Sequence, residues 1–288
     1  MVTTAIVTDS TAYLPAEDLD GLPVHVVPLH VVVGGREHRE GVDVGAAEVA
    51  AALRSFTPVS TSRPAPAAFL EAYEAAARDG ADGIVSVHIS GELSSTVAGA
   101  ELAAAESPVP VRVLDSRALG MVMGEAVLAG ARAARDGAGL DEVEALVRAT
   151  CAGASVVFYV DTLEYLRRGG RIGRAGALVG SALSIKPILG LREGHIVPLE
   201  RVRTSSRAIA RLEEIAVEAV ESALADGAPG VDVAVHHLDS AERADRLAER
   251  LGSRLTGSAV RVVELGAVVG AHVGPGTLAV AVVPRVAR

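Results

Sequence analysis

The chain has 288 residues, of which half are hydrophobic and 22% are charged, so it can build a sizeable core and is not a disordered chain. Acidic residues outnumber basic ones by 36 to 27, which gives a formal net charge of −9 and argues against a nucleic-acid-binding surface. One cysteine, Cys151, excludes a disulfide framework. Its apolar neighbours favour a small buried side chain over a reactive thiol.

The amino terminus has no basic region and reaches an acidic residue at Asp9, so we expect no signal peptide. The longest run without formal charge, residues 265–284, is interrupted at its centre by Gly274-Pro275-Gly276. Such a break would expose backbone groups to lipid, so we predict two buried strands joined by a turn there. The sequence thus predicts a cytoplasmic protein without an integral membrane segment.

In the first half of the chain, short β-branched segments alternate with alanine-rich segments of helical spacing. This alternation predicts a mainly parallel sheet with helices on both faces. The expected strands are 4–8, 24–29, 31–33, 83–89 and 111–114, and the expected helices are 46–55, 67–78, 95–105, 121–135 and 140–150.

The second half has a different order, in which a predicted hairpin precedes a strand–helix–strand unit. This order predicts a second α/β domain, with a mixed sheet and helices on one side. We place the domains at 1–153 and 154–288. The expected strands are 156–160, 187–191, 195–202, 231–238, 260–265 and 278–283, and the expected helices are 162–168, 175–184, 205–225 and 241–251.

Hydroxyl-bearing residues recur where strands are predicted to end. Ligands of parallel α/β sheets bind at the carboxyl ends of the strands. A helix that opens with such residues also offers free N–H groups to an anion. Each group alone is equally typical of helix caps and turns, but their recurrence indicates a shared polar site. The groups are Asp9-Ser10-Thr11, Thr61-Ser62, Ser90 with Ser94-Ser95-Thr96, and Asp115-Ser116.

A glycine-rich loop and one histidine are further candidates for a functional role. The glycine-rich loop 169–176 carries Arg171 and Arg174 and lacks the spacing of a dinucleotide-binding loop, so it is either an anion or partner contact or a solvated loop. His272 has glycines on both sides, which lets the backbone approach closely and can direct the ring into a cleft; a core histidine is the alternative. No metal-ligand spacing, Walker loop or nucleophile elbow occurs, so no metal and no cofactor is expected.

Six motifs, taken in order along nearly the whole chain, resemble the DegV family of bacterial fatty-acid-binding proteins, whose members include the subunits that present acyl chains to fatty acid kinase. Each motif is weak alone, and the ordered set is specific. The motifs are Thr8-Asp9-Ser10-Thr11, Thr61-Ser62-Arg63-Pro64, Ser90-Gly91-Glu92-Leu93-Ser94-Ser95-Thr96, Leu163 to Ile172, Ile185-Lys186-Pro187-Ile188-Leu189, and Gly270 to Thr277.

The resemblance implies two α/β domains, the EDD fold, with the lipid in a buried tunnel between them. It implies that the ligand carboxylate is held by the hydroxyls of Thr61 and Ser94, with Ser62, Ser95 and His272 also in the ligand site. Ser95 stands where the family usually has glycine, so the local start of the helix is expected to differ slightly.

The resemblance also implies a non-catalytic acyl carrier that offers a long-chain fatty acid to a separate, dihydroxyacetone-kinase-like fatty acid kinase. Arg171 and Arg203 are the expected contacts to that partner or to phosphate. Two alternatives stay open. One is a serine-dependent acyl hydrolase or transferase that uses Ser94 with His272 as base, and the other is a lipid sensor that works without a kinase.

Overall fold

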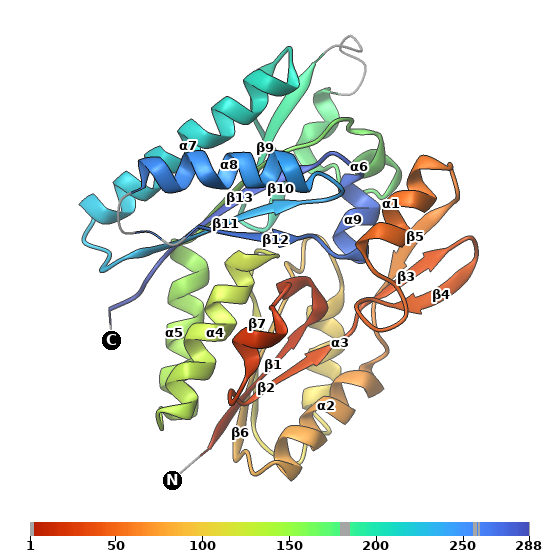
Figure 1. Ribbon diagram of the computed structural model, residues 1–288. Coiled ribbons are helices and arrows are strands. Elements are labelled where there is room, and N and C mark those ends of the chain that lie inside the picture. Colours follow the sequence, from red (N-terminus) through yellow and green to blue (C-terminus); the bar gives the residue numbers. More distant parts are fainter. Residues whose placement is uncertain (1–2, 179–184, 256–257, 259, 288) are drawn as a thin grey trace. The chain divides into compact units, whose positions relative to one another are not determined.

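The computed structural model describes residues 3–178, 185–255, 258 and 260–287, and the chain forms two compact units within them (Figure 1). Unit 1 contains Met1–His30 and Ser62–Gly153, and unit 2 contains Val31–Thr61 and Ala154–Arg288. The domains predicted from the sequence, 1–153 and 154–288, differ from these units at residues 31–61. The difference arises because that segment packs on a helix near the carboxyl terminus.

Unit 1 is built on a four-stranded sheet in which every pair of neighbours is parallel. The strand order is β2 (Val24–Val27), β1 (Thr4–Asp9), β6 (Gly83–His88) and β7 (Val111–Asp115). Since the strands are parallel, their carboxyl ends lie at one edge of the sheet, and the polar loops that follow β1, β6 and β7 meet there.

Helices cover both faces of this sheet, as predicted. Alternate residues of β1 point to opposite faces: Ile6 packs in the cluster with α4 (Met121–Arg135) and α5 (Leu140–Gly153). Val7 packs in the cluster with α2 (Pro66–Arg78) and α3 (Thr96–Ala104). The three-layer arrangement follows from strands that are apolar on both faces.

Residues 31–61 form a small sheet and a helix within unit 2. The sheet order is β4 (Arg36–Arg39), β3 (His30–Val33) and β5 (Val59–Ser62), and helix α1 spans Ala46–Arg54. The sequence did not indicate β4, because Arg-Glu-His-Arg has no apolar alternation. Gly34 and Gly35 form the turn between β3 and β4, and both residues have positive φ.

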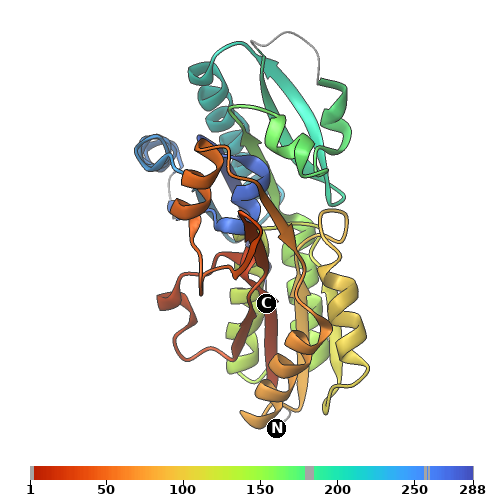
Figure 2. The ribbon, with the colours of Figure 1, turned by 90° about the vertical axis from the view of Figure 1, so that its right-hand side faces the viewer.

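The main sheet of unit 2 is mixed, as predicted: β11 and β12 are parallel, and the other neighbouring strands are antiparallel. The hairpin of β9 and β10 forms one edge of the sheet (Figure 2). The strand order is β10 (His195–Val202), β9 (Lys186–Arg192), β8 (Ser155–Tyr159), β13 (Leu278–Pro284), β11 (Val231–His237) and β12 (Val260–Glu264).

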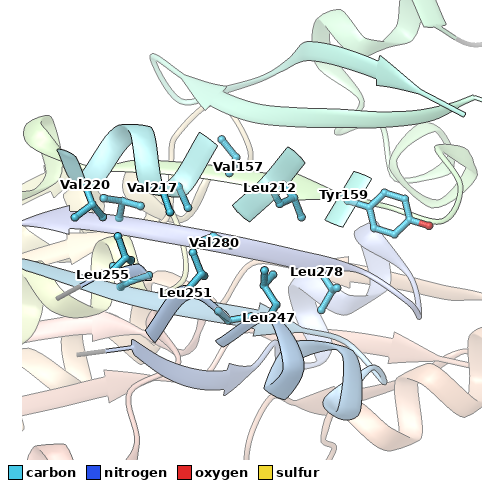
Figure 3. Close-up of a cluster of buried hydrophobic side chains, with 14 of the residues drawn as sticks. Val157, Tyr159, Leu212, Val217, Val220, Leu247, Leu251, Leu255, Leu278 and Val280 are labelled. Atoms are coloured by element: carbon cyan, nitrogen blue, oxygen red, sulfur yellow. The ribbon is translucent and has the colours of Figure 1, made fainter. Parts of the chain in front are cut away.

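Helices α7 (Ser205–Ala225) and α8 (Ala241–Arg254) pack together on this sheet, and their apolar side chains meet those of the strands in one buried cluster (Figure 3). The cluster is aliphatic except for Tyr159, whose hydroxyl points away from it. Leu212 and Leu247, one on each helix, are fully buried there. The helices predicted at 205–225 and 241–251 are therefore present, and each buries one apolar face in this cluster.

The prediction of two strands within residues 265–284 is wrong in its first half. Residues Ala267–Val273 form helix α9, and only β13 follows as a strand. A short apolar run does not distinguish a buried strand from a buried helix by periodicity. No described helix combines the length and the apolar character needed to cross a bilayer.

The predicted helix at 175–184 is only partly within the described residues. Gly173–Leu178 form a short 3-10 helix, and residues 179–184 lie outside the described part of the chain. Upstream, the predicted helix at 162–168 is present as α6 (Glu164–Arg168).

Candidate functional site

The structure brings two of the predicted site residues into direct contact. Thr61, near the end of β5, and His272, near the end of α9, are 211 residues apart, and Thr61 Oγ1 lies 2.8 Å from His272 Nε2. Both side chains belong to unit 2 and are half-buried. A hydroxyl at this distance forms a hydrogen bond with the imidazole.

Helix α9 is held in place by a distant carboxylate. Its N-cap residue is Gly266, which has no side chain to satisfy the free N–H groups of the first turn. Glu40, which is buried, accepts a hydrogen bond from the backbone N–H of Val268 at 2.8 Å. A carboxylate at a helix N-terminus is favoured by both the free donors and the helix dipole.

Apolar side chains also fix the position of α9 against α1. Val49 and Leu53 of α1 share one buried cluster with Ala267 and Ala271 of α9, and the two helices lie side by side (Figure 1). This cluster explains why residues 31–61 group with the carboxyl-terminal half. It also places β5, and with it Thr61, next to the helix that carries His272.

Two glycines allow the close approach of α6 and α9. A Cβ atom built on Gly169, directly after α6, would overlap the His272 ring at Nδ1. A Cβ atom on Gly274, directly after α9, would overlap the ring of Tyr165, and Gly274 has a φ of +78°. These steric requirements give a physical reason for the glycines in the motifs around residues 169 and 274.

The environment of His272 keeps its imidazole neutral. Burial, together with the nearby positive charge of Arg171, lowers the pKa of His272 to about 4. His272 Nδ1 is buried and has no hydrogen-bond partner among the described residues. With its proton on Nε2, the ring donates to Thr61 Oγ1, and the threonine proton can then point to another acceptor.

The two arginines expected to contact a partner lie in different settings. Arg171 Nη1 donates to the backbone oxygen of Gly169 at 2.7 Å, so part of its guanidinium is used to hold the turn after α6. Arg203 is exposed in the connection between β10 and α7, and it forms no ion pair within the described part of the chain.

Ser94 and Ser95 belong to unit 1, in the loop between β6 and α3. Helix α3 begins at Thr96, and Ser95 is its N-cap residue, but the Ser95 side chain makes no capping hydrogen bond. Ser94 Oγ lies 2.8 Å from Thr96 Oγ1, and Ser94 is half-buried. The helix start was predicted correctly, and capping does not account for these two hydroxyls.

The loop that carries Ser94 is anchored from both neighbouring strands. Asp9, at the end of β1, accepts from the backbone N–H of Ile89 at 2.9 Å. Asp115, at the end of β7, accepts from the N–H of Gly91 at 3.2 Å. Inside the loop, Ser90 accepts from the N–H of Ser94 at 3.0 Å. The aspartates that the sequence placed at strand ends therefore order the loop.

A buried histidine that was not among the predicted site residues forms a hydrogen bond with Asp9. His88 Nδ1 lies 3.1 Å from Asp9 Oδ2, and His88 Nε2 lies 2.7 Å from Ser86 Oγ. This is the connectivity of a catalytic triad, but all three side chains are fully buried in the sheet. A substrate cannot reach Ser86 there. The sequence feature that could have identified this group is the presence of two polar residues, Ser86 and His88, inside an apolar strand.

The single cysteine and the potential metal ligands are further candidate chemical groups. Burial raises the pKa of the Cys151 thiol to about 12, as the sequence led us to expect for an unreactive side chain. Among residues 3–176 and the other described side chains, no group of three potential metal ligands is found. Thr61 and Ser62 end β5, while Ser94 and Ser95 precede α3; that Thr61 and Ser94 hold one carboxylate stays a prediction.

Together the fold and these loops define a class: a protein of two α/β units with hydroxyl-bearing loops at strand ends and a neutral histidine bonded to one of the hydroxyls. Comparison with known proteins narrows that class. The family model described as uncharacterised protein, DegV family, matches residues 3–285. The chain belongs to the DegV family.

Known relatives match along nearly the whole chain. A DegV domain-containing protein of Streptomyces coelicolor is 53% identical over 282 residues, which is 98% of each chain. A DegV family protein from Thermus thermophilus, described by its fatty acid binding, has a TM-score of 0.89 at 35% identity, covering 98% of this chain and 100% of its own. DegV of Bacillus subtilis, described as a fatty acid binding protein, has a TM-score of 0.89 at 28% identity, covering 99% and 100%.

Proposed function

We propose that the chain binds one long-chain fatty acid and holds its carboxylate with the hydroxyls of Thr61 and Ser94. The observation that carries this proposal is the hydrogen bond between Thr61 and the neutral imidazole of His272. The relatives described as fatty acid binding proteins support it. A tunnel for the acyl chain belongs to the same proposal.

The chemistry of the head group requires donors rather than a buried cation. A carboxylate removed from water needs several charge-assisted hydrogen bonds, or it takes up a proton instead. An imidazole that donates from Nε2 commits the Thr61 oxygen as acceptor, so the Thr61 proton is directed to the ligand. Ser94 offers a second hydroxyl on a loop that Asp9 and Asp115 already order.

The acyl chain supplies most of the binding free energy in this proposal. Each buried methylene contributes roughly 0.8 kcal/mol, so a chain of about 14 methylenes yields about 11 kcal/mol before the cost of ordering the ligand. The head-group bonds then decide which class of lipid is held. A carboxylate fits the site, whereas an ester of the same chain leaves one hydroxyl without its charged acceptor.

We further propose that the bound carboxylate is presented to a separate fatty acid kinase. The chain has no phosphate-binding loop for ATP, so the kinase supplies the nucleotide. Charge is strongly segregated: residues 167–207 contain nine basic and two acidic side chains, although the whole chain has a net charge of −9. Such a segment fits an acidic partner surface.

The exposed arginines of that segment are the proposed partner contacts. Arg167 and Arg168 are excluded because both pair with Glu164. Arg171, whose Nη1 donates to the backbone oxygen of Gly169, is kept as a candidate because it lies in the basic segment. Five others are exposed and form no ion pair within the described part of the chain: Arg174, Arg192, Arg201, Arg203 and Arg207.

The lipid proposal is tested by titrating the delipidated protein with a long-chain fatty acid and with its methyl ester. We expect saturable binding of one acid per chain and an affinity for the ester that is at least tenfold lower. Equal affinities would contradict a carboxylate site, and no binding of either would contradict lipid binding.

The kinase proposal is tested separately, with the fatty acid kinase of the same organism and protein loaded with fatty acid. We expect acyl phosphate formation that falls severalfold for Arg203→Ala and less for Arg246→Ala, whose side chain lies on α8 beside Glu242. Unchanged rates for Arg203→Ala would remove Arg203 from the docking surface. No phosphorylation by the kinase with unmutated protein would favour a lipid sensor instead.

A further inference from the structure

Behind the Ser94 loop lies a continuous chain of hydrogen bonds between fully buried side chains. It runs from Asp9 through His88 to Ser86, and Ser86 Oγ lies 2.9 Å from the hydroxyl of Tyr73 on α2. The Tyr73 hydroxyl also donates to the backbone oxygen of Ala100 on α3 at 3.3 Å. All four side chains have no exposed surface.

This chain reaches both ends of the segment that carries Ser94. At one end, Asp9 accepts from the N–H of Ile89, the first residue after β6. At the other end, Tyr73 bonds the second turn of α3, the helix that begins two residues after Ser94. The seven residues from Ile89 to Ser95 are thus held between two points of one network.

Asp9 also caps the 3-10 helix Ser10–Ala12 by accepting a hydrogen bond from the N–H of Thr11, but no member of the network is placed for catalysis. Ser86, His88 and Asp9 cannot act on a substrate, because none of them is accessible. An apolar core of the same shape would cost less free energy. Buried polar groups lose their hydrogen bonds to water and replace them only with internal hydrogen bonds. Buried polar networks that are fully satisfied do fix one geometry.

We propose that the Asp9–His88–Ser86–Tyr73 network positions the Ser94 loop for carboxylate binding, and that Tyr73 and Ser86 are positioning residues for the ligand. This inference rests on the proposed fatty acid site. Its physical basis is that a hydroxyl displaced by about 1 Å from its acceptor lies outside hydrogen-bond distance.

The test uses the variants Tyr73→Phe and Ser86→Ala, each of which removes a hydroxyl while keeping the rest of the residue's volume nearly unchanged. The matched control is Thr150→Val, because Thr150 is a buried residue of unit 1 whose hydroxyl donates to the backbone oxygen of Leu146 within α5. Affinities for a long-chain fatty acid and for its methyl ester are measured for all four proteins. Amide hydrogen exchange of residues 89–95 is measured without ligand.

We expect both variants to lose about tenfold in affinity for the acid, the equivalent of one hydrogen bond, and little for the ester. We also expect faster exchange at residues 89–95 in both variants and no change of either kind in Thr150→Val. Unchanged exchange and acid affinity, or equal losses for acid and ester, would overturn the positioning role. If unmutated protein bound no fatty acid, the proposed function would fail, and the exchange data would still decide whether the network orders the loop.

Discussion

Thr61 and His272 are joined by a hydrogen bond of 2.8 Å although they come from opposite ends of unit 2's sequence. The bond requires that residues 31–61 fold onto the carboxyl-terminal half, so it depends on α1, α9 and Glu40 as much as on the two side chains. This relationship makes several outcomes testable.

Replacing Gly169 by alanine should displace the His272 ring. The new Cβ atom would overlap Nδ1, and the ring has little room because its Nε2 bonds Thr61. We expect a fall of at least tenfold in fatty acid affinity, measured by titration. The matched control is Gly252→Ala in α8, where a Cβ meets no atom within 4 Å and helix propensity predicts a gain of about 0.5–1 kcal/mol in stability. Equal affinities in both variants would show that the ring is not held in this way.

Removing the Glu40 carboxylate should loosen α9. Glu40→Ala leaves the N–H of Val268 without its buried acceptor, so we expect the free energy of unfolding to fall by about 1–3 kcal/mol in urea denaturation. Arg36→Ala, an exposed change in β4, the strand that ends just before Glu40, should stay within about 0.5 kcal/mol. A Glu40→Ala protein as stable as Arg36→Ala would contradict the capping role.

Stability should decline on mild acidification because of buried neutral histidines. Burial lowers the pKa of both His272 and His236 to about 4, whereas an unfolded histidine titrates near 6.5. Between these two pH values the unfolded chain binds more protons than the folded chain does, so the free energy of unfolding falls as the pH falls. The stabilising contribution of the two neutral histidines is complete above about pH 6.5 and is lost as the pH falls toward 4.

The variant His272→Gln isolates one of these two groups. Urea denaturation between pH 7.5 and pH 4.5 should show a shallower decline for this variant. The slopes of the two proteins should differ by less than about 1.4 kcal/mol per pH unit, which is the limit for the uptake of one proton. A decline as steep as that of unmutated protein would mean that His272 is not held neutral by folding.

The two predicted head-group hydroxyls should matter for affinity and not for folding. Thr61→Val and Ser94→Ala should each weaken fatty acid binding by about 1–3 kcal/mol. Their unfolding midpoints should stay close to that of unmutated protein. Ser60→Ala, an exposed change in the same strand as Thr61, is the control and should bind normally. Normal binding by Thr61→Val would place the carboxylate elsewhere.

The sequence predicts the elements whose pattern is local. The β–α alternation of unit 1 and the amphipathic helices α7 and α8 were expected with nearly correct limits, because periodic apolar residues report the buried face directly. The local pattern does not predict α9, a helix whose first turn is capped by Glu40 from 228 positions away. It also gave no sign that residues 31–61 pack with the second half.

In the candidate site, too, local features were predictable from the sequence and long-range contacts were not. Hydroxyls at strand ends were visible in the sequence, and so was His272 between glycines. The contact of His272 with Thr61 and the steric need for Gly169 follow from packing between segments far apart in the chain. His88 was missed because a polar residue in a buried strand acquires meaning only through its partners Asp9 and Ser86.

Native mass spectrometry of freshly purified protein, followed by denaturation and identification of the released lipid, tests fatty acid binding most directly. We predict one long-chain fatty acid per chain in the unmutated protein and its loss from the double variant Thr61→Val/Ser94→Ala. Unmutated protein that carries no fatty acid, or a double variant that retains it in full, would contradict the account.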